Sequence, residues 1–240
     1  MIYGLFFGFC VIAYLCGSVN FAIITTKAFT GGDVRSSGSG NAGMTNVMRT
    51  AGFLPGVITF FGDYIKAIAA VALGKYILPE LAKRWIPDLS AETLAILPIY
   101  GALFAGFFCL LGHMFPIFYG FRGGKGIVTA AGTMVVLDWR LFLIELGIFA
   151  VLFLITRIIS VGSILAAICY PLTAWICFFV MNPVEEVNRL AAQADVAVHA
   201  KWFIPIATGC AALLVVYKHK DNIRRLFKGE EKQLKLKKNK

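Results

Sequence analysis

The sequence predicts an all-α integral membrane protein, a bundle of about seven helical segments of which one is short. The chain of 240 residues is 59% hydrophobic, whereas soluble proteins are about 45–50% apolar. Its mean hydropathy is +0.77, and long apolar runs almost free of charge recur along it. Such runs reach the roughly 20 residues that a helix needs to cross a bilayer. One bundle accounts for this length, so we expect a single domain over 1–240.

The apolar runs predict a helix at each of seven places. One of them, 127–137, would reach only about 17 Å at the usual rise per residue, so we expect it to enter the membrane and turn back. The next run begins after the polar interruption at Asp138 and Arg140. The helices are expected at 2–25, 56–78, 94–118, 127–137, 141–156, 161–181 and 202–217.

The polar segments between these helices carry charge unevenly. They are loop A (26–55), a connection at 79–93, loop B (112–126), loop C (157–163), a connection at 182–201 and a tail from 218 onward. With the N-terminus outside, loops A, B and C and the tail hold 16 of the 23 Lys and Arg residues, and six lie outside. This bias follows the positive-inside rule. It predicts a cytoplasmic C-terminus, and the net charge of +10 indicates membrane lipids rather than nucleic acid as a partner.

The sequence indicates no metal site and no cofactor. The six cysteines all lie inside apolar runs and form no CxxC pair, so we interpret them as packing residues. No cluster of Asp, Glu and His has the spacing of metal ligands.

Loop A contains the stretch SSGSGNAGMTNVMR, which is rich in glycine, hydroxyl and amide side chains. Glycine permits tight turns and close approach of a ligand, and successive free amides can cradle an anion. A flexible linker is the alternative. The residues that could bind an anion here are Ser39, Gly40, Asn41, Gly43, Thr45, Asn46 and Arg49.

Loop B ends in GGKG, at Gly123, Gly124, Lys125 and Gly126, directly before a helix. Helix N-termini favour anions. The spacing is not that of a P-loop, so we do not expect a nucleotide site. A plain turn with one exposed lysine is the alternative.

Loop C offers the hydroxyls of Ser160 and Ser163, and the tail offers His219, Asn222 and Arg224. His219 and Asn222 are three residues apart, so they would share a helix face. A simple basic membrane anchor is the alternative for the tail. Two anion-binding loops on one face suggest two phosphate-bearing ligands, or one ligand and one leaving phosphate.

Three ionisable residues are expected within or at the end of membrane helices. Asp63 and Lys66 are three residues apart and would lie on one helix face. Buried charges are costly in a membrane and are usually paired or functional. Asp63 and Lys66 could form a structural ion pair or could help to shape the site. His113 could likewise have a structural or a functional role.

Four segments in chain order resemble the signature blocks of the bacterial acyl-phosphate:glycerol-3-phosphate acyltransferase (PlsY) family. They are GSGNAGMTNVMR, GHMFPIFYGFRGGKG, RIISVGS and KHKDNIRRLFKGEE. The resemblance implies transfer of a fatty acyl group from acyl phosphate to the 1-hydroxyl of glycerol 3-phosphate. The products would be lysophosphatidic acid and phosphate, the first step of phospholipid synthesis, made at the bacterial inner membrane.

The resemblance also implies roles for the residues named above. Glycerol 3-phosphate would bind Arg49, Lys125, His219, Asn222 and a loop C serine, while the glycine amides of loops A and B would hold the acyl phosphate. We expect direct attack by the glycerol hydroxyl. His219 or a substrate phosphate would take the proton, and Asn46 or the glycine-loop amides would hold the oxyanion.

Two other classes of protein are compatible with parts of the sequence. A transporter of a phosphorylated solute would explain an ion pair in the membrane, but it leaves the polar groups gathered on one face unexplained. A non-catalytic lipid-binding scaffold would explain the basic tail, but not loops A and B.

Overall fold

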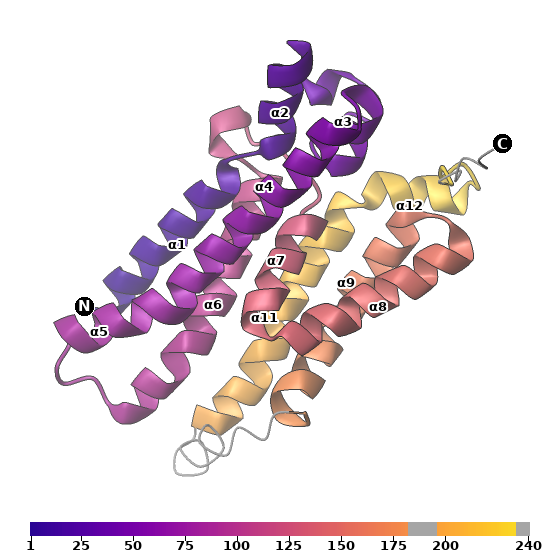
Figure 1. Ribbon diagram of the computed structural model, residues 1–240. Coiled ribbons are helices and arrows are strands. Elements are labelled where there is room, and N and C mark those ends of the chain that lie inside the picture. Colours follow the sequence, from indigo (N-terminus) through magenta and orange to yellow (C-terminus); the bar gives the residue numbers. More distant parts are fainter. Residues whose placement is uncertain (182–195, 234–240) are drawn as a thin grey trace.

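The computed structural model describes residues 1–181 and 196–233 and is helical throughout its ordered elements (Figure 1). Most helices run along the long axis of one elongated bundle, and the shorter ones cap its ends. The helices are α1 (Ile2–Ser18), α2 (Phe21–Thr30), α3 (Met44–Thr50), α4 (Phe53–Ala72), α5 (Leu78–Trp85), α6 (Ala91–Met114), α7 (Ile127–Leu137), α8 (Trp139–Thr156), α9 (Ile159–Phe179), α11 (Val196–Lys218) and α12 (Lys220–Phe227). Short turns of helix lie at η1 (Val34–Ser36), η2 (Leu73–Ile77, a π-helix) and η3 (Ile117–Tyr119).

Five runs are long and apolar enough to cross a membrane, namely Ile2–Thr30, Phe53–Trp85, Ala91–Tyr119, α8 and α9. The bent pair Trp202–Lys218 and Lys220–Phe227 makes a sixth, with an angle of 59° between its halves. Helix α7 is the short apolar segment between α6 and α8. Within the described residues the prediction of seven helical segments, one of them short, is thus confirmed. The chain is a multi-pass membrane protein.

The first span is not the single helix expected at 2–25. It breaks at Val19 and Asn20, where Val19 is extended and Asn20 begins α2 as its N-cap. The Asn20 side chain accepts a hydrogen bond from the amide of Ile23 at 3.1 Å. Asparagine is a strong N-cap, so the break has a local cause as well as the tertiary one described below.

Three predicted connections are more helical than the sequence suggested. Loop A contains the end of α2 and the whole of α3, and both helices pack on α4. The 79–93 connection continues as helix to Trp85. Helix α9 begins at Ile159, so the loop C serines lie on its first turns. The predicted connection at 182–201 falls largely at 182–195, outside the described residues.

Close helix crossings hold the left half of the bundle in Figure 1 together. Helix α1 packs along α6, where side chains at Gly17 or Gly112 would collide with the backbone of the facing helix. Gly74 and Gly101 make a second crossing of this kind between η2 and α6. Small residues allow such close approach in membranes, where packing replaces the hydrophobic drive.

The short helix α7 ends inside the bundle and is capped there by side chains. Lys75, counted from the sequence among the six outside cations, donates hydrogen bonds to the carbonyls of Val136 at 2.5 Å and Leu137 at 3.1 Å. Asp138 then starts α8 by accepting from the amide of Arg140 at 2.9 Å. These contacts satisfy backbone groups that lipid could not.

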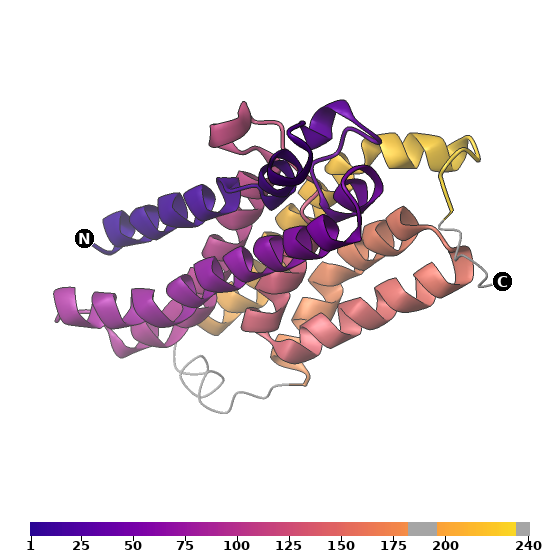
Figure 2. The same cartoon turned by 45° about the horizontal axis from the view of Figure 1, so that its top comes forward.

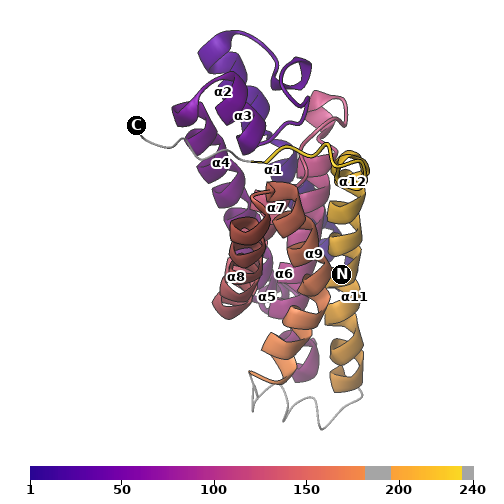
Figure 3. The same ribbon diagram turned by 90° about the vertical axis from the view of Figure 1, so that its right-hand side faces the viewer.

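Loops A and B, the start of α9 and α12 gather at one end of the bundle. Figures 1 and 3 both show α2, α3 and α12 at this end, with α5 and the beginning of α11 at the other. In Figure 2 the same segments come toward the viewer and lie across the tops of the long helices. Loops A, B and C and the start of the tail therefore lie at a single end of the protein (Figures 1 and 3).

Candidate active site

Loop A is folded around the buried side chain of Asn46 on α3. Its Oδ1 accepts a hydrogen bond from the Ser39 amide at 2.9 Å, and its Nδ2 donates to the carbonyls of Val34 at 3.0 Å and Ser37 at 2.9 Å. Both amide hydrogens are therefore used within the loop. This corrects the expected role of Asn46, because no hydrogen remains to hold an oxyanion. Its side chain holds the glycine turn instead.

The turn that Asn46 supports needs glycine at two positions. Gly38 and Gly40 have φ angles of +63° and +69°, a region that side chains disfavour. The amides of Gly40 and Gly43 bond to carbonyls of the same loop at 3.0 Å, so fewer amides are free for an anion than the sequence suggested. The predicted binding residues Ser39, Gly40, Thr45 and Arg49 are exposed, and Asn41 is half-buried.

Loop B lies against the end of α6 and against loop A. The amides of Gly123 and Gly124 bond to the carbonyls of Met114 at 3.2 Å and His113 at 3.1 Å. A side chain at Gly124 would collide with the His113 imidazole and with the carbonyl of Ala42 in loop A. These two glycines therefore allow close packing. Their amides are already hydrogen-bonded, so they are not free to bind a ligand.

The end of loop B remains suited to an anion. Gly126 is in the left-handed region, with φ +83°, and caps the N-terminus of α7. The first amides of a helix have no partner within it, and they point toward the Lys125 side of the loop. The predicted anion site thus narrows to Lys125, Gly126 and the start of α7.

Arg35 joins loops A and B directly. Its Nη1 donates to the carbonyl of Tyr119 at 2.7 Å and to that of Arg122 at 3.3 Å. The same guanidinium pairs with Asp33 at 2.7 Å. An arginine held by a carboxylate is a rigid donor, so this contact fixes the two loops against one another. The sequence analysis counted Arg35 only as a cytoplasmic cation.

Glu231 joins the remaining predicted segments into one network. Its Oε1 accepts hydrogen bonds from Ser160 at 2.7 Å and from Asn222 Nδ2 at 2.5 Å, and its Oε2 accepts from Arg225 Nε at 2.6 Å. The Oδ1 atom of the same Asn222 accepts from the Lys125 ammonium. Loop B, loop C and the tail therefore meet at a single point, as the sequence predicted for Lys125, Ser160 and Asn222.

The network is electrostatically unusual. Burial lowers the pKa of Lys125 to about 8. Burial alone would raise the pKa of Glu231, but hydrogen bonds from Arg225, Asn222 and Ser160 hold it below the ordinary value. The Glu231 carboxylate lies where three donors from α9 and α12 converge, so this arrangement of donors can bind a negatively charged group.

His219 sits beside this network, between α11 and α12. Its Nδ1 lies 2.8 Å from the carbonyl of Val215, so Nδ1 carries the proton and Nε2 is the acceptor. Burial, with a smaller contribution from the charge of Lys125, lowers the pKa of His219 to about 4. The imidazole is therefore neutral at pH 7.

Two predicted residues face away from the network. Arg224 is exposed and lies 3.7 Å from the exposed side chain of Asp221, whereas its neighbour Arg225 bonds to Glu231. The hydroxyl of Ser163 donates to the carbonyl of Ile159 at 3.0 Å, one turn back in α9. Among residues 1–181 and 196–233, no three His, Cys, Asp or Glu side chains group as metal ligands would.

Comparison with known proteins decides the family. Residues 7–229 match the family model described as glycerol-3-phosphate acyltransferase. The chain belongs to the glycerol-3-phosphate acyltransferase family. Curated members include a glycerol-3-phosphate acyltransferase of Chlorobaculum tepidum, 36% identical over 95% of this chain and 96% of its own. Another, from Clostridioides difficile, is 33% identical over 93% of each chain.

Solved structures of the family agree with this fold. A crystal structure of PlsY, an integral membrane glycerol 3-phosphate acyltransferase in its glycerol 3-phosphate form, is 30% identical. It covers 96% of both chains with a TM-score of 0.70. The lysophosphatidic acid form of PlsY is 29% identical, covers 96% of this chain and 95% of its own, and has a TM-score of 0.67. The membership of an acyltransferase family sets aside the transporter and scaffold alternatives.

Proposed function

We propose that the protein transfers a fatty acyl group from acyl phosphate to the 1-hydroxyl of glycerol 3-phosphate, giving lysophosphatidic acid and inorganic phosphate. The network that joins Lys125, Asn222, Ser160 and Glu231 carries this proposal, because it forms a polar site at the same end of the bundle as the two glycine loops (Figure 1). The glycerol 3-phosphate and lysophosphatidic acid forms described for PlsY support the acceptor and the product.

Acyl phosphate suits this site better than a thioester donor. The HxxxxD sequence of acyl-CoA-dependent acyltransferases is absent, since the fifth residue after each histidine is Phe118, Ile204 or Arg224. Acyl phosphate is already activated, so positioning and charge stabilisation can supply most of the rate. Lys125 gives one proton to Asn222 and has two more for phosphate oxygens.

The reaction needs one bond to form and one to break. The glycerol hydroxyl oxygen attacks the carbonyl carbon, the bond from that carbon to the phosphate oxygen breaks, and phosphate leaves with the electron pair. The hydroxyl proton passes to His219 Nε2 or to a phosphate oxygen. A pKa of about 4 makes His219 a weak base, so a substrate phosphate is the stronger candidate. Lys125 and the start of α7 stabilise the leaving charge.

Ser160 and Asn222 position the acceptor in this proposal. Ser160 is the loop C serine assigned to the site, because its hydroxyl reaches Glu231 while that of Ser163 is bonded within α9. Arg49 is exposed on α3 and remains a proposed phosphate ligand from the loop A side. Gly38, which lies in the turn that Asn46 supports, belongs to the same loop A side of the proposed site.

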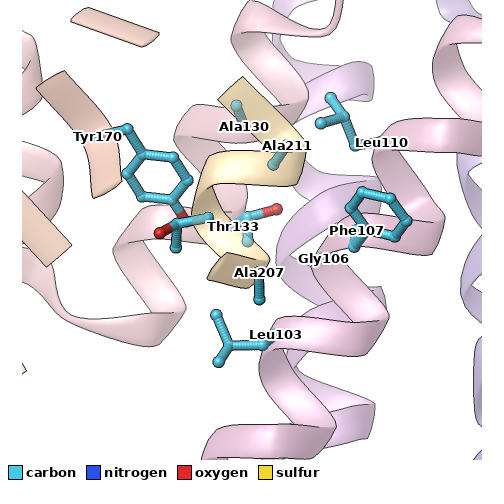
Figure 4. A pocket seen from close by; sticks show the side chains of 10 residues that line it. Leu103, Gly106, Phe107, Leu110, Ala130, Thr133, Tyr170, Ala207 and Ala211 are labelled. Atoms are coloured by element: carbon cyan, nitrogen blue, oxygen red, sulfur yellow. The ribbon is translucent and has the colours of Figure 1, made fainter. Parts of the chain in front are cut away.

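A small apolar hollow, with room for about one water molecule, lies among the helices (Figure 4), and the acyl chain would pass along its lining residues once these move apart. The pocket lies between α6, α7, α9 and α11, and Leu110, one of its lining residues, also packs against Gly126. One side of its lining therefore lies close to loop B. The lining residues are Leu103, Gly106, Phe107, Leu110, Ala130, Thr133, Tyr170, Ala207, Thr208 and Ala211.

We assign the loop face to the cytoplasm and the N-terminus to the outside. The support is the excess of Lys and Arg on that face and in the basic tail, where anionic membrane lipids would also bind. The bacterial inner membrane follows from the same assignment and from the bacterial relatives.

The test measures phosphate release by purified protein in detergent with glycerol 3-phosphate and palmitoyl phosphate. A parallel reaction offers palmitoyl-CoA and follows thiol release. We expect turnover with acyl phosphate only. Turnover with the thioester alone would overturn the proposed donor. Incubation with labelled acyl phosphate alone should leave no covalent label on the protein, and a trapped acyl-enzyme would refute direct transfer.

A further inference from the structure

Three ionisable side chains meet inside the bundle just below the glycine loops, and the reaction proposed above does not use them. They are Asp63 and Lys66 of α4 and His113 of α6. Their side chains are only 3%, 7% and 5% exposed. The Lys66 ammonium lies 2.7 Å from Asp63 Oδ1, and His113 Nδ1 lies 3.1 Å from the same nitrogen.

Lys66 also holds the break between α1 and α2. Its ammonium donates to the carbonyls of Gly17 at 3.0 Å and Val19 at 2.6 Å. A helix that ends inside a membrane leaves carbonyls that lipid cannot satisfy. Lys66 supplies the missing donors from a neighbouring helix. The direction in which α2 leaves the bundle, and with it the position of loop A, therefore depends on this ammonium.

His113 carries the same cluster to loop B. Its backbone carbonyl accepts from the Gly124 amide at 3.1 Å. Its imidazole faces Asp63 and Lys66 through Nδ1, while Nε2 lies on Gly124, where a Cβ would not fit. Gly124 in turn leaves no room between itself and Ala42 of loop A. The cluster therefore contacts loop B through His113, and through Lys66 it contacts the break from which α2 leads into loop A.

We propose that Asp63, Lys66 and His113 form a positioning element that sets the separation of loops A and B. None of the three touches substrate in this assignment. Lys66 fixes the start of α2, and His113 fixes Gly124, while Asp63 balances the buried charge. The proposal rests on the proposed function, because those loops are where acyl phosphate is expected to bind. An ion pair that only stabilises the fold would have no local effect on the loops.

Lys75 provides a matched control for Lys66. It too is a lysine that donates to the terminal carbonyls of a broken helix, in its case at the C-terminus of α7. It lies in η2, away from the glycine loops. Lys75→Met removes one such cap with little change in volume. Lys66→Met also leaves Asp63 buried and unpaired, so the double variant Asp63→Asn/Lys66→Met, which removes both charges, is the variant whose stability loss is matched to that of Lys75→Met.

The experiment compares both variants by hydrogen–deuterium exchange and by kinetics. In Lys66→Met we expect loop B amides, those of Gly123 and Gly124 included, to exchange about ten-fold faster or more, as in local opening. We expect kcat/KM for palmitoyl phosphate to fall by about 10- to 100-fold, the effect of a misplacement near 1 Å. Lys75→Met should lower the unfolding temperature without either change.

Two outcomes would overturn the proposal. One is a Lys66→Met variant in which the loop B amides exchange at the wild-type rate. The other is that loop exchange and kcat/KM change in proportion to the loss of stability, by the same amount in both lysine variants. If Lys66→Met does not fold because its Asp63 is unpaired, the double variant Asp63→Asn/Lys66→Met removes both charges and gives the same readouts. Absence of acyl phosphate turnover in the wild type would refute the proposed function, while the exchange comparison would still decide this proposal.

Discussion

Lys125 and Asn222 are 97 positions apart in the chain, yet the Lys125 ammonium donates a hydrogen bond to Asn222 Oδ1. Lys125 precedes the half-length helix α7, and Asn222 lies on α12 beyond the last span. The contact forms only when these segments fold against one another. The same amide group donates to Glu231 at 2.5 Å, so its orientation is fixed and Oδ1 faces the lysine.

The charge of Lys125 should set the alkaline limit of activity. Burial lowers its pKa to about 8, from about 10.4 in water. The cation is present below this pKa and lost above it, so kcat/KM for glycerol 3-phosphate should fall as pH rises through about 8. The measurement is phosphate release between about pH 6 and about pH 10, corrected for spontaneous hydrolysis of the acyl phosphate. Lys125→Arg keeps its charge throughout, so its profile should lack this fall.

Gly124 should tolerate no side chain, although its backbone is not in a left-handed conformation. Gly124→Ala would force the His113 imidazole and the Ala42 carbonyl apart, so we expect about a 100-fold loss of kcat/KM from displaced loops. Gly120→Ala is the matched control in the same loop. Gly120 has φ +63° but open space around it, so the change costs only about 1–2 kcal/mol of backbone strain. Equal losses in the two variants would argue against close contact between the loops.

Arg225 and Arg224 are neighbours on α12 with different expected effects. Arg225 bonds to Glu231 at 2.6 Å, whereas Arg224 is 76% exposed at the side chain. Arg225→Ala removes a charge-assisted hydrogen bond worth about 1.5–3 kcal/mol, so kcat/KM should drop by about ten-fold or more. Arg224→Ala should stay within about two-fold, since exposed ion pairs contribute little. The reverse order of effects would support the binding role expected for Arg224.

The residues that line the small hollow of Figure 4 should influence which acyl chains are accepted, if the chain passes along them as proposed. Ala207 lines this hollow from α11. Ala207→Leu adds about three carbon atoms to the side chain and so fills space that an acyl chain would need. Overpacking costs about 1–3 kcal/mol, so palmitoyl phosphate should lose more kcat/KM than a shorter acyl phosphate. Leu213→Phe on the exposed side of α11 is the control. An unchanged chain-length profile in Ala207→Leu would place the acyl chain elsewhere.

Much of the fold was predictable because membrane helices follow hydrophobic length closely. The short helix α7 could be predicted from the 11 residues of Ile127–Leu137, which are too few to cross. The break at Val19 was not predicted, although Asn20 is a strong N-cap, because the apolar run resumes at Phe21 and long membrane helices tolerate single polar residues. Its cause lies partly in Lys66, which is 47 positions away from Val19. Sequence indicated that Lys66 was buried, but not which carbonyls it would bind.

The candidate site was predictable where residue chemistry alone suffices. Lys125, Ser160 and Asn222 meet as expected, whereas Glu231 escaped notice as one acid in a basic tail. Arg225 had a usable signal, since it continues the three-residue spacing of His219 and Asn222 on one helix face. The amide of Asn46 looked reactive in sequence, but only the structure shows that Val34 and Ser37 use both of its hydrogens.

The most direct test of the site is a crystal structure of this protein with glycerol 3-phosphate bound. The account predicts a phosphate oxygen about 3 Å from Lys125 Nζ and a glycerol hydroxyl in contact with Asn222 or Ser160. Loss of this density in Lys125→Ala crystals, with the helices unmoved, would support the assignment further. A phosphate bound away from Lys125, with the contact between Lys125 and Asn222 intact, would contradict it.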